Sequence, residues 1–146
     1  MPILIKEHSA KTTVSPQTIW RFWSDVDHWN TWDSDIEWSK SDGPFQLGQT
    51  GKLKPKGGPV VKTKITECTP NKSFSDSSKL FLATIHFDHS IEQTKDGNII
   101  KTKIMMAGPL AWLFAKLMGK SLAAGLEPSI RNLIAQAEAY EKNQKS

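Results

Sequence analysis

Hydrophobic positions along the chain change their spacing twice. Residues 3–14 alternate loosely between apolar and polar side chains, which predicts a first strand. Ser15-Pro16 follows, a pair typical of a helix start, because Ser caps the helix and Pro fits its first turn. The aromatic-rich segment 19–23 continues at helical spacing. Asp25-Val26-Asp27 should end this helix, and a second short helix should run to about Trp32.

The middle of the chain consists of short alternating segments separated by turn residues. Gly57-Gly58 and Asp96-Gly97 each lie between two such segments, and both pairs are signals of a β-hairpin. The pattern predicts one meandering antiparallel sheet of about seven strands, counting the first. The six further strands are expected near residues 36–38, 50–54, 60–68, 73–77, 83–92 and 98–106.

The last part of the chain has a period of 3.6 and is rich in good helix formers, from Pro109 to about Asn143. Gly125 and Pro128 weaken its middle, and Pro128 should bend the helix nearby. An antiparallel sheet with one apolar face needs a cover, and this long helix supplies it. The order of elements therefore predicts an α+β fold in a single domain, residues 1–146.

Composition restricts the classes of function. Hydrophobic residues make up 38% of the 146 and charged residues 23%, an ordinary balance for a globular domain. The net charge is +4, but only two residues are arginines, and the lysines recur at alternate strand positions such as Lys62 and Lys64. That spacing places them on one side of a strand. We therefore expect a solvated sheet face and no specific nucleic-acid partner.

Other features exclude further classes. Cys68 is the single cysteine, so no disulfide forms within the chain, and no His or Cys lies near it at metal-ligand spacing. We expect no metal and no cofactor. The chain does not begin like a signal peptide, and its longest apolar stretch, 109–118, is too short to cross about 30 Å of hydrocarbon. We expect no transmembrane segment, a cytoplasmic location, and a monomer or weak homodimer.

Several short motifs occur in an order that resembles one known family. They are the segments 14–20 and 24–32, Ile65-Thr66-Glu67 before Pro70, Gly97 between the last two strands, and Met106-Ala107-Gly108-Pro109-Leu110. Together they resemble the polyketide cyclase/dehydrase and lipid-transport branch of the START-like (SRPBCC) helix-grip superfamily. The resemblance implies a curved sheet that grips the C-terminal helix, with a cavity between them. It implies no particular reaction, because the superfamily includes carriers, hormone sensors and cyclases.

If the apolar residues of each strand face inward, the sheet and the helices enclose a mostly apolar chamber with few polar groups, as small-molecule sites usually are. Leu117 is a further candidate for its roof. The outward face then carries residues such as Lys62, Lys64, Lys101 and Lys103. The residues expected to contact a ligand are Trp23, Trp32, Trp38, Thr63, Ile85, Phe87, His89, Thr102, Ile104, Met106, Phe114 and Met118.

His89 interrupts an otherwise apolar inward series between Phe87 and Ile91. It is a structural core histidine, a hydrogen-bonding group for a ligand, or an acid–base group, since imidazole titrates near neutral pH. Catalysis needs a second titratable group. The nearest candidates by pattern are Glu37, which falls on the outward phase, and Glu67, near a strand end.

We assign no catalytic residue from the sequence. The leading hypothesis is a non-catalytic binder or carrier of a small hydrophobic or amphipathic ligand. The alternatives are a polyketide-type cyclase or dehydratase that uses His89, and a protein-interaction or stress-response module whose cavity is only structural.

Overall fold

The computed structural model describes residues 2–145, with side chains through Gln144, and these residues form an antiparallel sheet and three helical segments. The helical segments are α1 (Pro16–Ser24), the 3-10 helix η1 (Val26–Thr31) and α2 (Ala111–Lys145). The strands are β1 (Ile3–Thr12), β2 (Ile36–Ser41), β3 (Thr50–Pro55), β4 (Val61–Thr69), β5 (Ser73–Leu80), β6 (Ala83–Thr94) and β7 (Gly97–Ala107).

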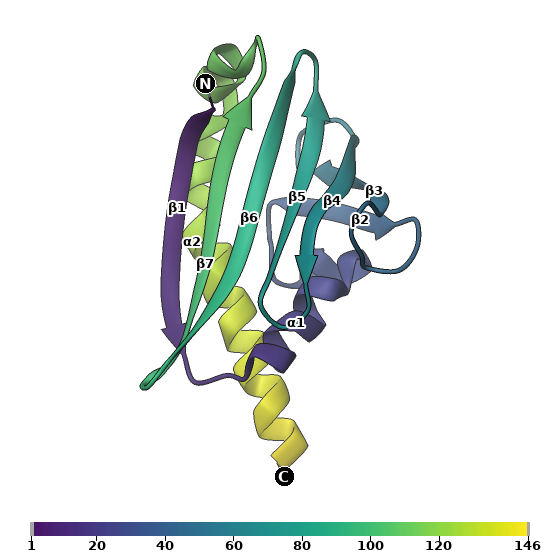
Figure 1. The fold of residues 1–146 in the computed structure, drawn as a ribbon. Helices are drawn as coiled ribbons and strands as arrows, with labels where there is room; N and C mark the ends of the chain where they lie inside the picture. The colour runs from purple at the N-terminus through teal and green to yellow at the C-terminus, as the bar shows by residue number, and fades with distance from the viewer. Residues whose placement is uncertain (1, 146) are drawn as a thin grey trace.

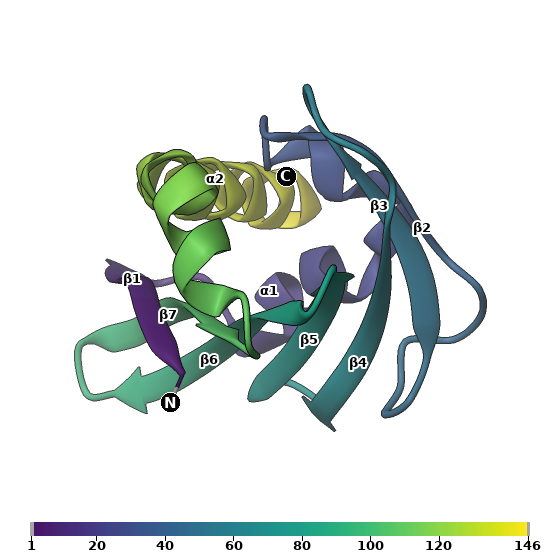
Figure 2. The same ribbon diagram turned by 90° about the horizontal axis from the view of Figure 1, so that it is seen from above.

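The seven strands are arranged in the order β1-β7-β6-β5-β4-β3-β2, and every neighbouring pair is antiparallel. Strands β2 to β7 thus form a simple meander, and β1 pairs with β7 as the edge strand at that side of the sheet. The sheet curves around α2, while α1 and η1 lie toward the end of the sheet near the C-terminal part of α2 (Figures 1 and 2). This confirms the predicted α+β helix-grip fold.

The predicted start of α1 is confirmed. Ser15 is its N-cap, and the Ser15 hydroxyl accepts a hydrogen bond of 3.3 Å from the Thr18 N–H. One carboxylate oxygen of Glu141 accepts bonds from the Ser15 N–H, the Ser15 hydroxyl and the Thr18 hydroxyl, at 2.9, 2.8 and 2.6 Å. The cap of the first helix is thereby attached to the last turns of α2.

Helix α2 begins two residues later than predicted and continues without interruption through Pro128 to Lys145. Its first turns, green in Figure 2, run in a different direction from the yellow remainder. Gly125 lies against the end of the Asp35 side chain. A Cβ at residue 125 would collide with this exposed carboxylate unless the Asp35 side chain moved aside.

The strand faces separate as the alternation predicts, with one correction in β2. The outward residues Lys62, Lys64 and Lys101 are exposed. Trp38, predicted to face inward, is 38% exposed. The pairing of β2 with β3 shifts register between Ile36 and Trp38, so the inner position passes to Ser39, which is buried and donates to the Val26 carbonyl.

Candidate ligand-binding site

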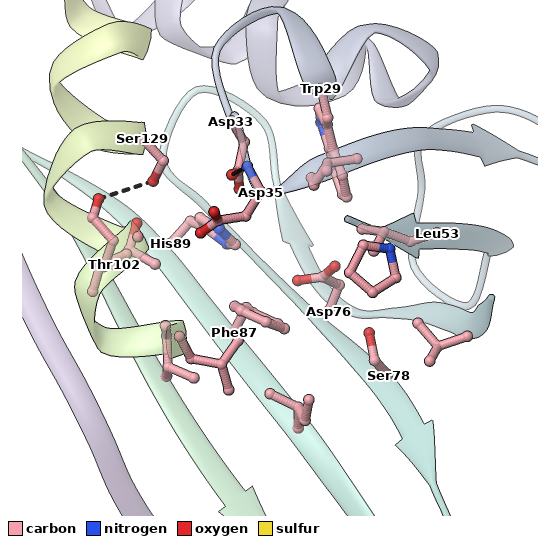
Figure 3. A pocket seen from close by; sticks show the side chains of 18 of the residues that line it. Trp29, Asp33, Asp35, Leu53, Asp76, Ser78, Phe87, His89, Thr102 and Ser129 are labelled. Carbon is pink, nitrogen blue, oxygen red and sulfur yellow. Dashed lines mark hydrogen bonds between the residues drawn. The ribbon is translucent and has the colours of Figure 1, made fainter. Parts of the chain in front are cut away.

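An apolar cavity of about 230 Å³ lies between the inner face of the sheet and α2. Strands β2 to β7, α1, η1 and α2 supply its walls, together with the connections before β2 and after β3. Figure 3 shows the side chains directed into it. The volume is slightly below the range of about 300–1,000 Å³ that is usual for drug-sized ligands, so the space suits a small molecule.

Eight of the twelve predicted ligand contacts line this cavity. Trp23 and Trp32 come from the region of α1 and η1, and Met118 comes from α2. The remaining five lie on the two longest strands, at Ile85, Phe87, His89, Thr102 and Ile104. Their alternation along β6 and β7 was therefore assigned to the correct face.

The structure places the other four elsewhere. Trp38 is on the outer side because of the shifted register of β2. Thr63 and Met106 are buried but are not among the residues that line the cavity. Phe114 is half-buried and packs against the core outside the cavity, and Leu117, expected in the roof, is 72% exposed.

Asp76 is the most unusual residue of the wall. It lies in β5 between Phe74 and Ser78, which share its inner face, and only 4% of it is exposed. Its Oδ1 has no hydrogen-bond partner among the described residues. Burial, and secondarily the Asp88 carboxylate, raise the pKa of Asp76 to about 7, against a smaller opposing effect of a backbone hydrogen bond. The carboxyl group is therefore close to half-protonated at neutral pH.

His89 packs flat on Phe74, with ring centroids 4.0 Å apart and ring planes 5° apart, and contacts the Trp23 ring at 5.6 Å. Its Nδ1 lies 3.3 Å from the Phe74 carbonyl oxygen. A carbonyl only accepts, so Nδ1 carries the proton and Nε2 keeps its lone pair. Burial lowers the pKa of His89 to about 4, although the Phe74 carbonyl and Asp88 act in the opposite direction. His89 is therefore a neutral acceptor at neutral pH.

Asp76 and His89 are close on the sheet. The register of β5 and β6 pairs Phe74 with His89 and Asp76 with Phe87. Asp76 and His89 are thus diagonal neighbours on one face, positions that are typically about 7–8 Å apart. The cavity holds a carboxyl group with a raised pKa and an imidazole with a lowered pKa side by side.

Two more carboxyl groups lie at the cavity, both in the connection between η1 and β2. Asp33 Oδ1 accepts a hydrogen bond of 3.0 Å from the Asp35 N–H, and burial raises the pKa of Asp33 to about 6. Asp35 and Pro59 are the exposed residues of the described lining. The mouth of the cavity therefore lies between this connection, the β3–β4 hairpin and α2.

The sequence pattern did not identify Asp76, because strand 73–77 was expected without an assignment of its faces. Phe74 is the signal that would have found it, since an inward Phe74 turns Asp76 and Ser78 inward as well. The partners suggested for His89 do not line the cavity. Glu37 is exposed and pairs with Lys54 at 2.7 Å, and Glu67 accepts hydrogen bonds from Thr69 and Ser73.

A curved antiparallel sheet that holds a long helix above an apolar chamber defines a helix-grip protein. Residues 7–138 match the family model described as "Polyketide cyclase / dehydrase and lipid transport". The chain belongs to this family, which confirms the resemblance carried by its motifs. None of the curated protein sequences compared is detectably similar to it.

Solved structures show the same fold at low sequence identity. The di-domain ARO/CYC StfQ from the steffimycin biosynthetic pathway has a TM-score of 0.77 at 11% identity over 97% of this chain; the chain spans about half of StfQ, 52% of its length. Norcoclaurine synthase of Thalictrum, solved with a transition-state analogue, has a TM-score of 0.73 at 13% identity over 97% of both chains. Ara h 8.0201 has a TM-score of 0.66 at 12% identity, over 95% of this chain and 99% of that protein.

Within residues 2–145, no helix combines the length and the apolar character needed to cross a membrane.

Proposed function

We propose that this protein binds a small, largely apolar molecule in the cavity and holds one polar group of that molecule against Asp76. The observation that carries the proposal is the buried Asp76 Oδ1, which has no hydrogen-bond partner in the described part of the chain and lies on an otherwise mainly apolar wall. Such an unpaired buried group costs about 1–3 kcal/mol. A ligand with a hydrogen-bond donor recovers that free energy, while the apolar walls bind the rest of the molecule.

Tryptophan fluorescence can test this, because Trp23, Trp29 and Trp32 line the cavity. Two neutral probes of similar shape, 2-phenylethanol and ethylbenzene, are titrated into the wild type and into Asp76→Leu. We expect saturable binding of both by the wild type. Asp76→Leu should weaken only 2-phenylethanol, by about fivefold, the equivalent of about 1 kcal/mol for one hydrogen bond.

Asp96→Asn, in the exposed β6–β7 turn, is the matched control and should bind like the wild type. If neither probe gives a saturable change, the cavity does not bind small molecules and the proposal is wrong. That result would favour the alternative of a cavity that is only structural.

Acid–base catalysis is a second candidate function, favoured by the opposite pKa shifts of Asp76 and His89. A carboxyl group with a pKa of about 7 can donate or accept a proton near neutral pH, and the neutral His89, a weak base with a pKa of about 4, can accept a hydrogen bond from the same substrate. Proton removal next to a carbonyl is a step that cyclisation and dehydration reactions share. The test follows exchange of the α-protons of phenylacetone in heavy water by NMR.

Exchange that the protein accelerates, and that falls by roughly 10²–10⁴ in Asp76→Asn and in His89→Phe, would make the protein a catalyst. If the α-protons exchange no faster with the protein than in buffer alone, the catalytic candidate is wrong and ligand binding is the function that is left. The expected cytoplasmic location, the monomer or weak homodimer and the lack of a specific nucleic-acid partner stay predictions from the sequence.

A further inference from the structure

We propose that the ligand is a cationic amphiphile, an ammonium group attached to a small apolar or aromatic body. This inference rests on the ligand-binding function proposed above and narrows that function to one chemical class.

The charges that face the cavity carry one sign. Asp33, Asp35 and Asp76 contribute carboxyl groups, and no lysine or arginine is among the described residues of the lining. The remaining titratable side chain of the lining, His89, is neutral. An anionic ligand such as a carboxylate would meet the like charge of these carboxyl groups and no lysine or arginine of the described lining, whereas a cation would be attracted at both the mouth and the wall.

Asp76 gives the independent evidence for a ligand. It is 4% exposed, its Oδ1 has no partner among residues 2–145, and Figure 3 shows its carboxyl group directed into the cavity together with that of Asp35. A buried carboxylate is stable when a cation accompanies it, and the described residues of the lining include no lysine or arginine. The three carboxyl groups are not a metal site, since no group of three potential ligands in the described residues is placed to hold an ion.

The aromatic residues of the wall suit the same ligand. Trp29, Phe74 and Phe87 line the cavity together with Trp23 and Trp32. A cation within about 6 Å of such a ring is attracted to its face, and the attraction is stronger where water is excluded. In such a cavity the aromatic side chains pack against the aryl group of an arylalkyl ammonium ion, and the carboxyl group among them binds the ammonium group.

The proposal predicts how pH affects binding. The groups that face or influence Asp76 are Asp33 and Asp35 from the η1–β2 connection, and His89 and Asp88 on the two faces of β6, whereas the lining of α2 carries no charge. As pH rises through about 7, Asp76 ionises, while an alkylammonium with a pKa of about 10 keeps its charge. Affinity for the amine should therefore increase from pH 6 to pH 8.

Three probes of nearly equal size separate the possibilities: 2-phenylethylamine, 2-phenylethanol and 3-phenylpropionate, titrated by calorimetry at pH 8. We expect the amine to bind at least about tenfold more tightly than the alcohol, the gain typical of a hydrogen bond to a charged group, and the carboxylate not to bind. Asp76→Asn should remove most of the preference for the amine and leave alcohol binding within about twofold. Asp96→Asn, a surface carboxyl group, should change neither.

Equal binding of all three probes, or the same preference for the amine in Asp76→Asn, would overturn this inference but leave the binding function in place. Tighter binding of the carboxylate would overturn it as well. Failure of all three, with ethylbenzene also unbound, would instead remove the proposed function itself.

A second inference concerns the opposite end of the molecule from the C-terminus, where exposed apolar side chains gather. Phe81 and Leu82, in the turn between β5 and β6, are 64% and 55% exposed, and Trp112 and Leu117, in the first turns of α2, are 61% and 72% exposed. The two segments meet, because the Leu110 N–H donates to the Leu82 carbonyl at 2.9 Å. Figure 1 shows this turn and the start of α2 at the same end of the fold. We call these four residues the apolar tip.

Two details of the tip argue against a chance arrangement. Leu82 has φ +54°, an unfavourable backbone conformation for a residue with a branched side chain, and it presents that side chain to solvent. Gly108 has φ +108°, and a Cβ there would lie 2.8 Å from the Leu82 carbonyl, so only glycine permits this close approach.

The segments that form the apolar tip and its flanks carry only positive charges. Segments 77–87 and 104–126 contain no aspartate or glutamate, and their lysines are Lys79, Lys116 and Lys120, all exposed. Exposed aromatic and leucine side chains among lysines match the boundary of an anionic bilayer, where apolar groups insert and lysines meet lipid phosphates. We infer that the tip docks on an anionic membrane surface.

The tip also adjoins the cavity. Leu80 precedes Phe81 and lines the cavity, and Met118 follows Leu117 and lines it too. Docking through the tip would therefore bring one end of the cavity close to the bilayer, where an amphiphile is dissolved.

Vesicle co-sedimentation tests the docking. The wild type should bind vesicles of phosphatidylcholine with 30% phosphatidylserine, bind those of pure phosphatidylcholine at least about tenfold more weakly, and be released by 0.5 M salt. Trp112→Ser with Leu82→Ser should abolish binding, and Lys116→Glu should weaken it by about fivefold or more. Leu47→Ser, an equally exposed leucine outside the tip, is the control and should bind normally.

Binding that ignores lipid charge, or that survives both tip substitutions, would overturn the membrane inference. A tip that buries itself in a second copy of the chain would instead give a concentration-dependent dimer, broken by Trp112→Ser in analytical ultracentrifugation without vesicles. That outcome would also overturn it.

Discussion

His89 and Phe74 form a parallel stack across strands β6 and β5, with centroids 4.0 Å apart and an angle of 5° between the rings. The His89 Nδ1–H also donates to the carbonyl of Phe74 itself. One residue thus fixes both the plane and the tautomer of the imidazole. His89 is at once part of the aromatic core and part of the cavity wall, so its two roles need separate variants.

Truncation of His89 should cost stability. His89→Ala removes a ring that stacks on Phe74 and contacts Trp23, and loss of a buried aromatic ring typically costs about 3 kcal/mol. His89→Phe keeps the ring and should cost less than about 1.5 kcal/mol. Urea unfolding, with its midpoint and slope, measures both. A His89→Ala protein as stable as the wild type would show that the stack contributes nothing.

His89 should also make the free energy of unfolding depend on pH in the acidic range. Its folded pKa, about 4, is below its ordinary value of 6.5, so between these values the unfolded chain binds a proton that the folded protein does not. The wild type should therefore lose stability from this group as pH falls from 6.5 to 4, on the order of 3 kcal/mol in total. His89→Phe should lack this contribution in unfolding curves measured at each pH.

Asp76 should have the opposite effect. Its folded pKa, about 7, is above its ordinary value of 3.8, so the folded protein retains a proton that the unfolded chain releases, and stability falls as pH rises from 3.8 to 7. Asp76→Asn should be more stable than the wild type at pH 8, by on the order of 4 kcal/mol at most, and about equal at pH 4. An Asp96→Asn control should follow the wild type at both pH values.

The fold was predictable because period and turn chemistry agree along most of the chain. The alternation that places Lys62 and Lys64 outward also places Ile65 in the core, and Ser15-Pro16 starts α1 as expected. The local pattern and the tertiary contacts act in the same direction at these positions.

The parts of the site that could not be predicted depend on features outside a regular period. The register shift in β2 reverses the face of Trp38, and no hydrophobic pattern marks such a bulge in advance. Leu117 fits the helical period but is exposed. Its exposure could not be predicted, because the period does not show which turns of α2 the sheet covers. Asp33 and Asp35 reach the cavity from an irregular connection, which has no period to extrapolate.

Gly125 and Asp35 should be energetically coupled. Alanine in a helix interior is normally more stable than glycine by about 1 kcal/mol, but a Cβ at residue 125 would collide with the Asp35 carboxylate. Gly125→Ala should therefore gain about 1 kcal/mol only in an Asp35→Ala background, and less than that in the wild type. A double-mutant cycle of unfolding free energies measures the difference, for which we expect at least about 0.5 kcal/mol. If the two changes in unfolding free energy were strictly additive, the Asp35 carboxylate would move away from residue 125 without an energetic cost.

The last prediction separates an open cavity from a filled core without relying on charge. Ser78 is 4% exposed, lines the cavity and is opposite Thr63 in the pairing of β5 with β4, while Thr63 does not reach the cavity wall. A ring introduced at residue 78 has the cavity of about 230 Å³ to enter, whereas a ring at residue 63 meets packed neighbours.

Ser78→Phe should therefore block binding of 2-phenylethanol and change the free energy of unfolding by less than about 1 kcal/mol. Thr63→Trp should destabilise the domain by about 1–3 kcal/mol, the usual cost of overpacking, because its ring cannot reach the open space. Calorimetric titration and urea unfolding of the two variants give both quantities. If Ser78→Phe were the more destabilised of the two, residue 78 would lie in a filled core and the cavity would not be a binding site. If it folded well and still bound the probe, binding would occur elsewhere on the protein, so only the combination of normal stability and lost binding supports the cavity.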